Sequence, residues 1–211
     1  MGIKEKIIEL KKSEISKIVN QRLKEFKSFE TKNELDWFSE LCFCLLTANS
    51  KAITAINIQN KLKGKGFLDL NQEELSKTIK DNNHRFCNNK AKYIVLAREY
   101  SNIKNIVQKL VKIVGEKKTR DYLAETIKGI GYKEASHFLR NTGHNNVAIL
   151  DRHILRTLFE NNYIKEIPKT LTKKKYHEFE NILETISKEL NMNQAELDLY
   201  MWYLKTGKVL K

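Results

Sequence analysis

Apolar residues recur every three to four positions along most of the chain, which is the period of a helix with one buried face. Residues 3–28 give one or two such helices. Further helices are predicted over 37–46, from 53 onward, and over 71–81, 90–100 and 103–114, then after Thr172 and from Gln194 to about Lys205. This pattern predicts an all-α fold.

The most informative stretch runs from Thr119 to Arg156, because helical spacing on both sides flanks the segment Lys128-Gly129-Ile130-Gly131-Tyr132-Lys133. This arrangement predicts a helix, a tight turn and a second helix. We expect Ile130 to enter the core, and Gly129 and Gly131 to adopt conformations or close approaches that a Cβ would obstruct. The amides of such a turn and of the following helical turn point outward, so they form a seat for phosphate.

Two ionisable residues add chemistry to this seat. Lys133 falls in the first turn of the second helix, where the helix dipole opposes protonation and favours a nucleophilic free amine. Asp151 directly follows the apolar run 147–150 and precedes a new helical pattern from Ile154. A buried run that ends in a carboxylate can aim it at the mouth of a cleft.

Each feature also has a purely structural interpretation. An aspartate before a helix is usually an N-cap, and a lysine in a first turn is usually a solvated surface charge. Glycines between helices often form only a short connection. The order of hairpin, Lys133, apolar run, Asp151 and His153 favours the functional interpretation.

The chain is strongly basic, with 39 Lys and Arg against 26 Asp and Glu, a formal net charge of +13 and a pI of about 9.5 among 211 residues. The excess is spread along the chain, so it predicts attraction to polyanions, and nucleic acid is the first partner to consider. The alternative is a Lys-rich protein that binds no polyanion. A single proline and eight glycines agree with an all-helical protein.

The remaining composition excludes several classes of protein. Three cysteines are an odd number, and Cys42 and Cys44 fall within an apolar helix, so reduced core thiols are expected. No Cys or His cluster has metal-ligand spacing, and we expect neither a metal nor a cofactor. No signal-peptide core follows Met1 and no apolar run could span a membrane, which favours a cytoplasmic protein, in a prokaryotic cytosol.

The segments 128–136 and 150–153 resemble the helix-hairpin-helix, Gly/Pro-rich loop, Asp signature of base-excision DNA glycosylases. The segments 41–49, 84–86, 128–141, 151–156 and 197–211 look like those of the archaeal-type 8-oxoguanine DNA glycosylase/AP lyases, and together they cover nearly the full chain. One departure is that no proline precedes Asp151. The chain also lacks the four C-terminal cysteines that hold an iron–sulfur cluster in many endonuclease III relatives.

The resemblance assigns roles to particular residues. Lys133 and Asp151 match the catalytic pair of the family, and Lys211 matches a terminal lysine implicated in telling 8-oxoguanine from guanine. Arg85, Phe86 and Trp202 fall where residues of the base pocket are expected. Contacts with DNA are expected from Asn49, which would fill the gap left by a flipped base, and from Lys128, Gly129, Gly131 and His153.

The fold that the resemblance implies is two helical domains with a cleft between them. A central domain over 33–144 would carry the hairpin, and 1–32 would join 145–211 in the second domain. The implied partner is double-stranded DNA that contains 8-oxoguanine or abasic sites. A monomer with no membrane contact is expected.

The implied reaction begins when Lys133 attacks C1′ of the damaged nucleotide, and the resulting Schiff base permits β-elimination. Asp151 would stabilise positive charge on the sugar or accept a proton. A carboxylate or carbonyl at the Lys211 terminus would accept a hydrogen bond from N7 of the lesion. Two alternatives are an enzyme of the same scaffold that acts on oxidised pyrimidines, and a helix-hairpin-helix protein that binds DNA without catalysis.

Overall fold

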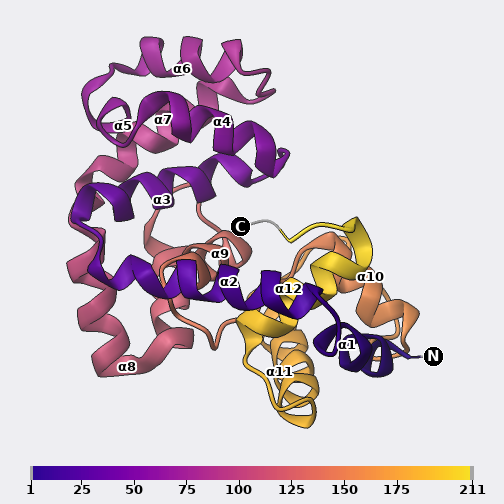
Figure 1. Cartoon of the computed structure of the whole chain (residues 1–211). Helices are drawn as coiled ribbons and strands as arrows, with labels where there is room; N and C mark the ends of the chain where they lie inside the picture. The colour runs from indigo at the N-terminus through magenta and orange to yellow at the C-terminus, as the bar shows by residue number, and fades with distance from the viewer. Residues whose placement is uncertain (1, 210–211) are drawn as a thin grey trace. The chain divides into compact units, whose positions relative to one another are not determined.

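The structure is a computed structural model in which residues 2–209 are described. It confirms the all-α prediction, since residues 2–209 contain α-helices and short 3-10 helices and no strand. Contacts divide the chain into one unit of residues 29–138 and another of residues 1–28 with 139–211 (Figure 1). The functional domains expected at 33–144 and at 1–32 with 145–211 stay a prediction. Their boundaries lie a few residues from the boundaries of these two units.

The unit of residues 29–138 is built around a buried helix. Its elements are η1 (Phe29–Thr31), α3 (Glu34–Thr47), α4 (Ala52–Leu62), α5 (Lys65–Asp69), α6 (Gln72–Asp81), α7 (Cys87–Ala97), η2 (Arg98–Tyr100), α8 (Ile103–Thr126) and the first part of α9 (Tyr132–Asn141). Every residue of α3 from Trp37 to Thr47 is buried, and α3 packs against α4, α7 and α8. Such a helix, buried on all sides and mostly apolar, belongs in the centre of a core.

Local signals in this unit account for where its helices begin and break. Asn71 caps α6, and its side chain and that of Glu74 form a reciprocal capping box. Gly115 interrupts α8 with φ of 80° and ψ of 169°, so the helix predicted over 103–114 ends where expected and a second helical stretch leads to the hairpin. Cys42 and Cys44 are buried free thiols as predicted, and burial raises the pKa of Cys42.

The second unit consists of α1 (Ile3–Lys11), α2 (Ile15–Ser28), the end of α9, α10 (Arg152–Glu160), α11 (Lys173–Glu189) and α12 (Gln194–Thr206). The last helix joins the two ends of the chain, because α12 packs against α1, α2, α10 and α11. Arg140 forms a buried ion pair with Asp198 of α12 and stacks over the ring of Phe26 of α2, 4.8 Å from its centroid.

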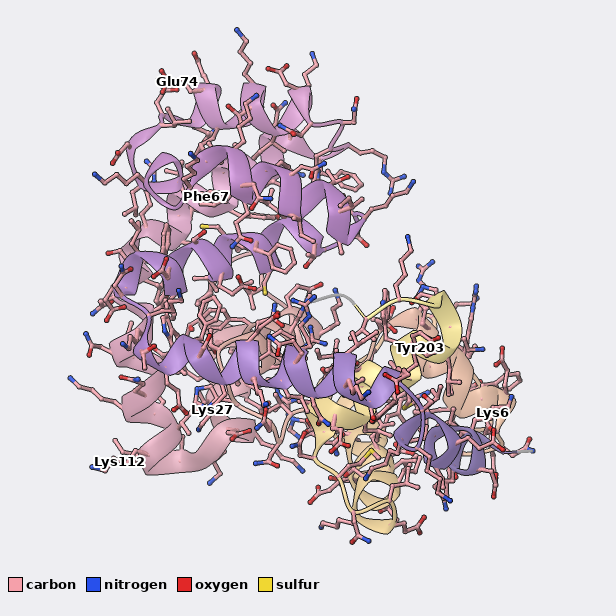
Figure 2. All side chains as sticks on the ribbon, viewed as in Figure 1. Lys6, Lys27, Phe67, Glu74, Lys112 and Tyr203 are labelled. Atoms are coloured by element: carbon pink, nitrogen blue, oxygen red, sulfur yellow. The ribbon has the colours of Figure 1, made fainter. Side chains whose placement is uncertain are left out.

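The excess positive charge is distributed over exposed helix faces, as the sequence predicts. Lys6 on α1, Lys27 on α2 and Lys112 on α8 are all exposed to solvent (Figure 2). Within residues 2–209 no helix combines the length and the apolar character needed to cross a bilayer.

Candidate active site

The predicted hairpin is present between α8 and α9, and the buried residue is the expected one. Ile130 is 5% exposed, and its amide closes a turn on the carbonyl of Ile127 at 3.1 Å. Gly129 has φ of 92°, in the left-handed region that favours glycine. A Cβ there would lie 2.5 Å from Cδ2 of Tyr93 and 3.1 Å from Cδ2 of Leu45. Gly129 is therefore needed both for backbone conformation and for close packing.

The other glycine of the hairpin has a milder requirement. A Cβ on Gly131 would lie 3.1 Å from Oε2 of Glu134, which is the far end of a flexible side chain. Gly131 precedes α9, and its carbonyl accepts a hydrogen bond from the amide of Ala135 at 2.9 Å. Lys128, at the start of the hairpin, is exposed. The hairpin thus presents a cation and the first-turn amides of a helix, which suit an anionic ligand.

Lys133 is the second residue of α9, in the first turn as predicted. Its side chain is 27% exposed, and Nζ lies 3.5 Å from Oε1 of Glu134. Lys90 of α7 is close enough for its amine to be influenced by the charges of both residues. The amine of Lys133 is thus partly withdrawn from water and stands among charged groups.

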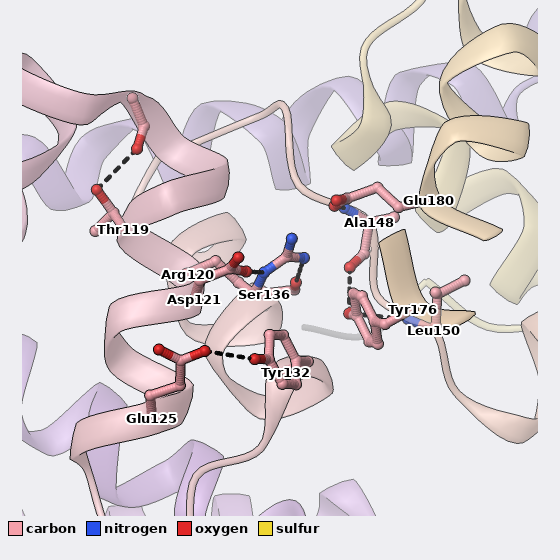
Figure 3. Close-up of polar contacts among 11 residues, drawn as sticks. Thr119, Arg120, Asp121, Glu125, Tyr132, Ser136, Ala148, Leu150, Tyr176 and Glu180 are labelled. Carbon is pink, nitrogen blue, oxygen red and sulfur yellow. Dashed lines mark hydrogen bonds and ion pairs between the residues drawn. The ribbon is translucent and has the colours of Figure 1, made fainter. Parts of the chain in front are cut away.

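A polar network holds the start of α9 against α8 (Figure 3). Arg120 is fully buried, forms an ion pair with Asp121 at 2.6 Å and donates to Oγ of Ser136 at 3.4 Å. Its guanidinium also stacks on the ring of Tyr132, 5.5 Å from the centroid, and the Tyr132 hydroxyl donates to Glu125 at 2.8 Å. Because Tyr132 and Ser136 flank Lys133 along α9, this network fixes the helix that carries the lysine.

Asp151 lies in the other unit, at the end of an extended segment and at the start of α10. Its Oδ1 accepts from the amide of Ile154 at 2.8 Å, so Asp151 is the N-cap of α10. Asp151 therefore has the structural role that its place before a helix suggests. The N-cap hydrogen bond leaves the carboxylate able to accept others, because a carboxylate has two oxygens and several acceptor positions.

The segment before Asp151 is fixed by two buried side chains of α11 (Figure 3). Glu180 accepts from the amide of Ala148 at 3.0 Å. The hydroxyl of Tyr176 donates to the carbonyl of Ala148 at 2.7 Å and accepts from the amide of Leu150 at 3.4 Å. These bonds satisfy the backbone of a buried segment that has no helix or strand partner, and they set the position from which Asp151 projects.

Three other predicted residues come together in the unit of residues 29–138. Asn49, in a turn after α3, is exposed and has φ of 60°. Arg85 donates to the carbonyl of Asn49 at 3.4 Å and stacks over the ring of Phe86, 5.2 Å from its centroid. Phe86 is 41% exposed, although it is a large apolar side chain. An amide, a guanidinium and an aromatic ring thus share one exposed surface.

One further residue, for which no role was predicted, joins these two turns. His84 is 3% exposed, and its Nε2 bonds to the carbonyl of Leu46 at 2.9 Å. Its Nδ1 accepts from the amide of Phe86 at 3.2 Å. Burial lowers the pKa of His84, which favours the neutral ring that Nδ1 needs in order to accept. In the sequence, the signal for this role is that His84 directly precedes Arg85 and Phe86.

The remaining predicted residues lie in the other unit or outside the described range. Trp202 of α12 packs edge-on against His153 of α10, with ring centroids 5.1 Å apart. Among the described residues, the buried indole nitrogen of Trp202 has no hydrogen-bond partner. Lys211 lies outside the described residues. No group of three or more His, Cys, Asp or Glu residues within 2–209 is placed to hold a metal ion.

The chain is all-α, its glycine hairpin precedes the first-turn Lys133, and a buried segment precedes Asp151; this order matches the helix-hairpin-helix class. The sequence model of the 8-oxoguanine DNA glycosylase family, the helix-hairpin-helix Ogg family, matches residues 19–192, and the chain belongs to that family.

Individual relatives agree with this assignment. The chain is 57% identical to an 8-oxoguanine DNA glycosylase/AP lyase of Methanocaldococcus jannaschii over 211 residues, which is 100% of both chains. It is 43% identical to a relative of the same name from Aquifex aeolicus, with 94% of this chain and 95% of the relative covered.

Solved structures are similar over the same length. A crystal structure of the Methanocaldococcus jannaschii 8-oxoguanine glycosylase/lyase in complex with a 15mer DNA containing 8-oxoguanine matches with a TM-score of 0.95 at 56% identity, covering 99% of each chain. The 8-oxoguanine DNA glycosylase of Thermotoga maritima matches with a TM-score of 0.92 at 40% identity, covering 99% of this chain and 98% of the other.

Proposed function

We infer that this chain is a bifunctional base-excision repair enzyme, which removes 8-oxoguanine from DNA and cleaves the abasic site that remains. The observation that carries this inference is the 57% identity, over the full length of both chains, to a relative named 8-oxoguanine DNA glycosylase/AP lyase. The likeness to a structure in complex with DNA containing 8-oxoguanine supports duplex DNA as the substrate.

Recognition of DNA begins with charge. The formal charge of +13 attracts the duplex, and the exposed Lys128 with the hairpin amides next to Gly129 and Gly131 binds a backbone phosphate. This clamp carries no sequence information, which suits an enzyme that must find a lesion in any sequence. His153 is proposed as a further DNA contact from the other unit.

The damaged nucleotide must leave the base stack before chemistry can occur on its sugar. Asn49 is proposed to fill the gap that the base leaves, beside Arg85 and Phe86. An exposed guanidinium stacked on an exposed ring suits contact with an unstacked base. Trp202 is proposed to contact the flipped base. Lys211 is proposed to distinguish 8-oxoguanine from guanine.

The chemical step requires a nucleophile that can also form an imine, and a lysine amine meets both needs. Lys133, as the free amine, attacks C1′ and displaces the base. The sugar then opens to a Schiff base on Nζ of Lys133, which acidifies the C2′ proton and permits β-elimination of the 3′ phosphate. One residue thus serves both the glycosylase and the lyase step.

Asp151 supplies the negative charge that this reaction needs. Positive charge develops on the sugar as the base leaves, and a fixed carboxylate stabilises it. The N-cap bond to Ile154 and the bonds that Tyr176 and Glu180 make to the preceding segment hold that carboxylate in place. We propose that the enzyme acts as a monomer on genomic DNA in a prokaryotic cytosol, and that it needs no cofactor.

The test of this function is a panel of duplexes that carry one 8-oxoguanine, one oxidised pyrimidine or one abasic site. We expect release of 8-oxoguanine, cleavage at the abasic site and little action on the oxidised pyrimidine. Preference for the pyrimidine would identify an enzyme of the same scaffold with another substrate. Tight binding of all three duplexes without cleavage would identify a DNA-binding module that lacks catalysis.

A further inference from the structure

A second carboxylate stands beside the proposed nucleophile. Glu134 follows Lys133 in α9, and its Oε1 lies 3.5 Å from Nζ of Lys133. Adjacent residues of a helix do not normally face each other, so this contact exists because the Glu134 side chain turns back toward the hairpin. Its Oε2 lies 3.1 Å from the place where Gly131 would carry a Cβ. The glutamate side chain is only 14% exposed, and a larger residue at 131 would crowd it.

A buried cation accompanies this pair. Lys90 is 5% exposed, and its Nζ donates to the carbonyl of Leu45 at 2.6 Å. Burial lowers the pKa of Lys90, the negative charge of Glu134 raises it, and the positive charge of Lys133 lowers it. A carboxylate oxygen can accept a proton, and the Glu134 carboxylate lies near the amines of both lysines.

We propose that Glu134 is a catalytic residue, which accepts a proton from Nζ of Lys133 once that nitrogen is bonded to C1′ and returns the proton to the sugar. The proposal rests on the proposed function of Lys133 as the nucleophile. It separates the two carboxylates of the site by role, because Glu134 then moves the proton while Asp151 stabilises charge on the sugar.

The free amine of Lys133 forms a bond to C1′, and the bond from C1′ to the base breaks with its electron pair on the base, which leaves as an anion and takes a proton from a buffer acid in the solvent. The nitrogen is now a secondary ammonium, and Glu134 removes one of its protons. The nitrogen lone pair then forms the protonated imine as the bond from C1′ to O4′ breaks with its electron pair on O4′, and O4′ takes the proton from Glu134.

The acidity of the Lys133 nitrogen explains why a proton acceptor is needed once that nitrogen is bonded to C1′. A carboxylate is a much weaker base than an alkylamine, so a glutamate does not readily deprotonate a resting lysine ammonium. A nitrogen attached to a carbon that also bears an oxygen is far more acidic, because the oxygen withdraws electrons. The free energy of the proton transfer is then close to zero, and a general base is effective under that condition.

The test is a comparison of Glu134→Gln with wild type in single-turnover reactions on a duplex with one 8-oxoguanine. Cleavage is measured with alkali, which reports all base release, and without alkali, which reports only strand cleavage by the enzyme. The matched control is Glu74→Gln, since Glu74 is also the third residue of a helix and accepts from the amide of the preceding cap residue at 2.9 Å (Figure 2). Glu74 has no proposed role in the reaction, so Glu74→Gln shows what the loss of a first-turn carboxylate does apart from the proton transfer.

We expect Glu134→Gln to release 8-oxoguanine within about threefold of wild type and to cleave the strand about 100-fold more slowly. Glu74→Gln should match wild type in both measurements. An equal loss of both activities in Glu134→Gln, or no loss of either, would overturn the proposal. Failure of wild type to release the base, or strand cleavage that persists in Lys133→Gln, would instead overturn the function on which the proposal rests.

Discussion

His84 accepts a hydrogen bond from the backbone amide of Phe86, with 3.2 Å between Nδ1 and the amide nitrogen, while its other ring nitrogen bonds to Leu46. One neutral imidazole therefore joins the turn that carries Arg85 and Phe86 to the end of α3. Protonation at Nδ1 would replace this attraction with a clash between two donors.

This arrangement predicts a pH-dependent contribution to stability. Because burial lowers the pKa of His84 in the folded state, the unfolded chain binds its proton more readily. The stabilisation is complete above the unfolded pKa and is lost as the pH falls through that value toward the folded pKa. Thermal unfolding should show the Tm of wild type falling more steeply between about pH 7.5 and 5.5 than that of His84→Gln, which does not titrate. Parallel curves would remove His84 from this role.

Gly129→Ala tests the hairpin. The substituted residue would be strained at φ of 92° and its Cβ would meet the ring of Tyr93, so we expect a loss of about 2 to 4 kcal/mol in the free energy of unfolding. Gly207→Ala is the matched control, because Gly207 has φ of 67° but no atom within 4 Å of an added Cβ. That variant should lose only about 1 to 2 kcal/mol in denaturant titrations. Equal losses would contradict close packing at Gly129.

Lys128→Ala should weaken DNA binding without regard to sequence. If Lys128 neutralises one phosphate, the slope of log K against log salt concentration should become shallower by about 0.9. Lys112→Ala removes an equally exposed charge from α8 and is the control. Binding isotherms at several salt concentrations check this, and an unchanged slope in Lys128→Ala would exclude the phosphate contact.

Asp151→Asn and Asp151→Ala separate capping from catalysis. Asparagine can still accept from the amide of Ile154, so Asp151→Asn should keep nearly the wild-type Tm, whereas Asp151→Ala should lose about 1 kcal/mol of stability. Both variants lack the charge, and both should lose base excision by about 100-fold or more. Wild-type excision by Asp151→Asn would reduce Asp151 to an N-cap.

Much of this fold was predictable because its helices are amphipathic and because the residues that end or break them act locally. Periodicity placed the helices, Gly115 broke α8 where the pattern ended, and the two hairpin glycines flanked a buried Ile130. These features depend on neighbours within one or two helical turns, which a single sequence displays.

The contacts that shape the site could not be predicted in this way. His84 reaches a carbonyl 38 residues earlier in the chain, and Lys90 reaches one 45 residues earlier, so both depend on tertiary packing. The approach of Glu134 to Lys133 runs against helical periodicity. Lys133 and Asp151 belong to different units, and the proposal that they act together comes from the family resemblance rather than from any pattern of spacing.

The central claim is that Lys133 forms a covalent bond to the sugar, and borohydride trapping tests it most directly. Wild type, Lys133→Gln and Asp151→Asn would each be mixed with borohydride and a duplex that carries one 8-oxoguanine. We predict a covalent protein–DNA adduct with wild type and none with Lys133→Gln. An adduct that persists in Lys133→Gln, or no adduct from wild type on DNA that it binds, would contradict the claim.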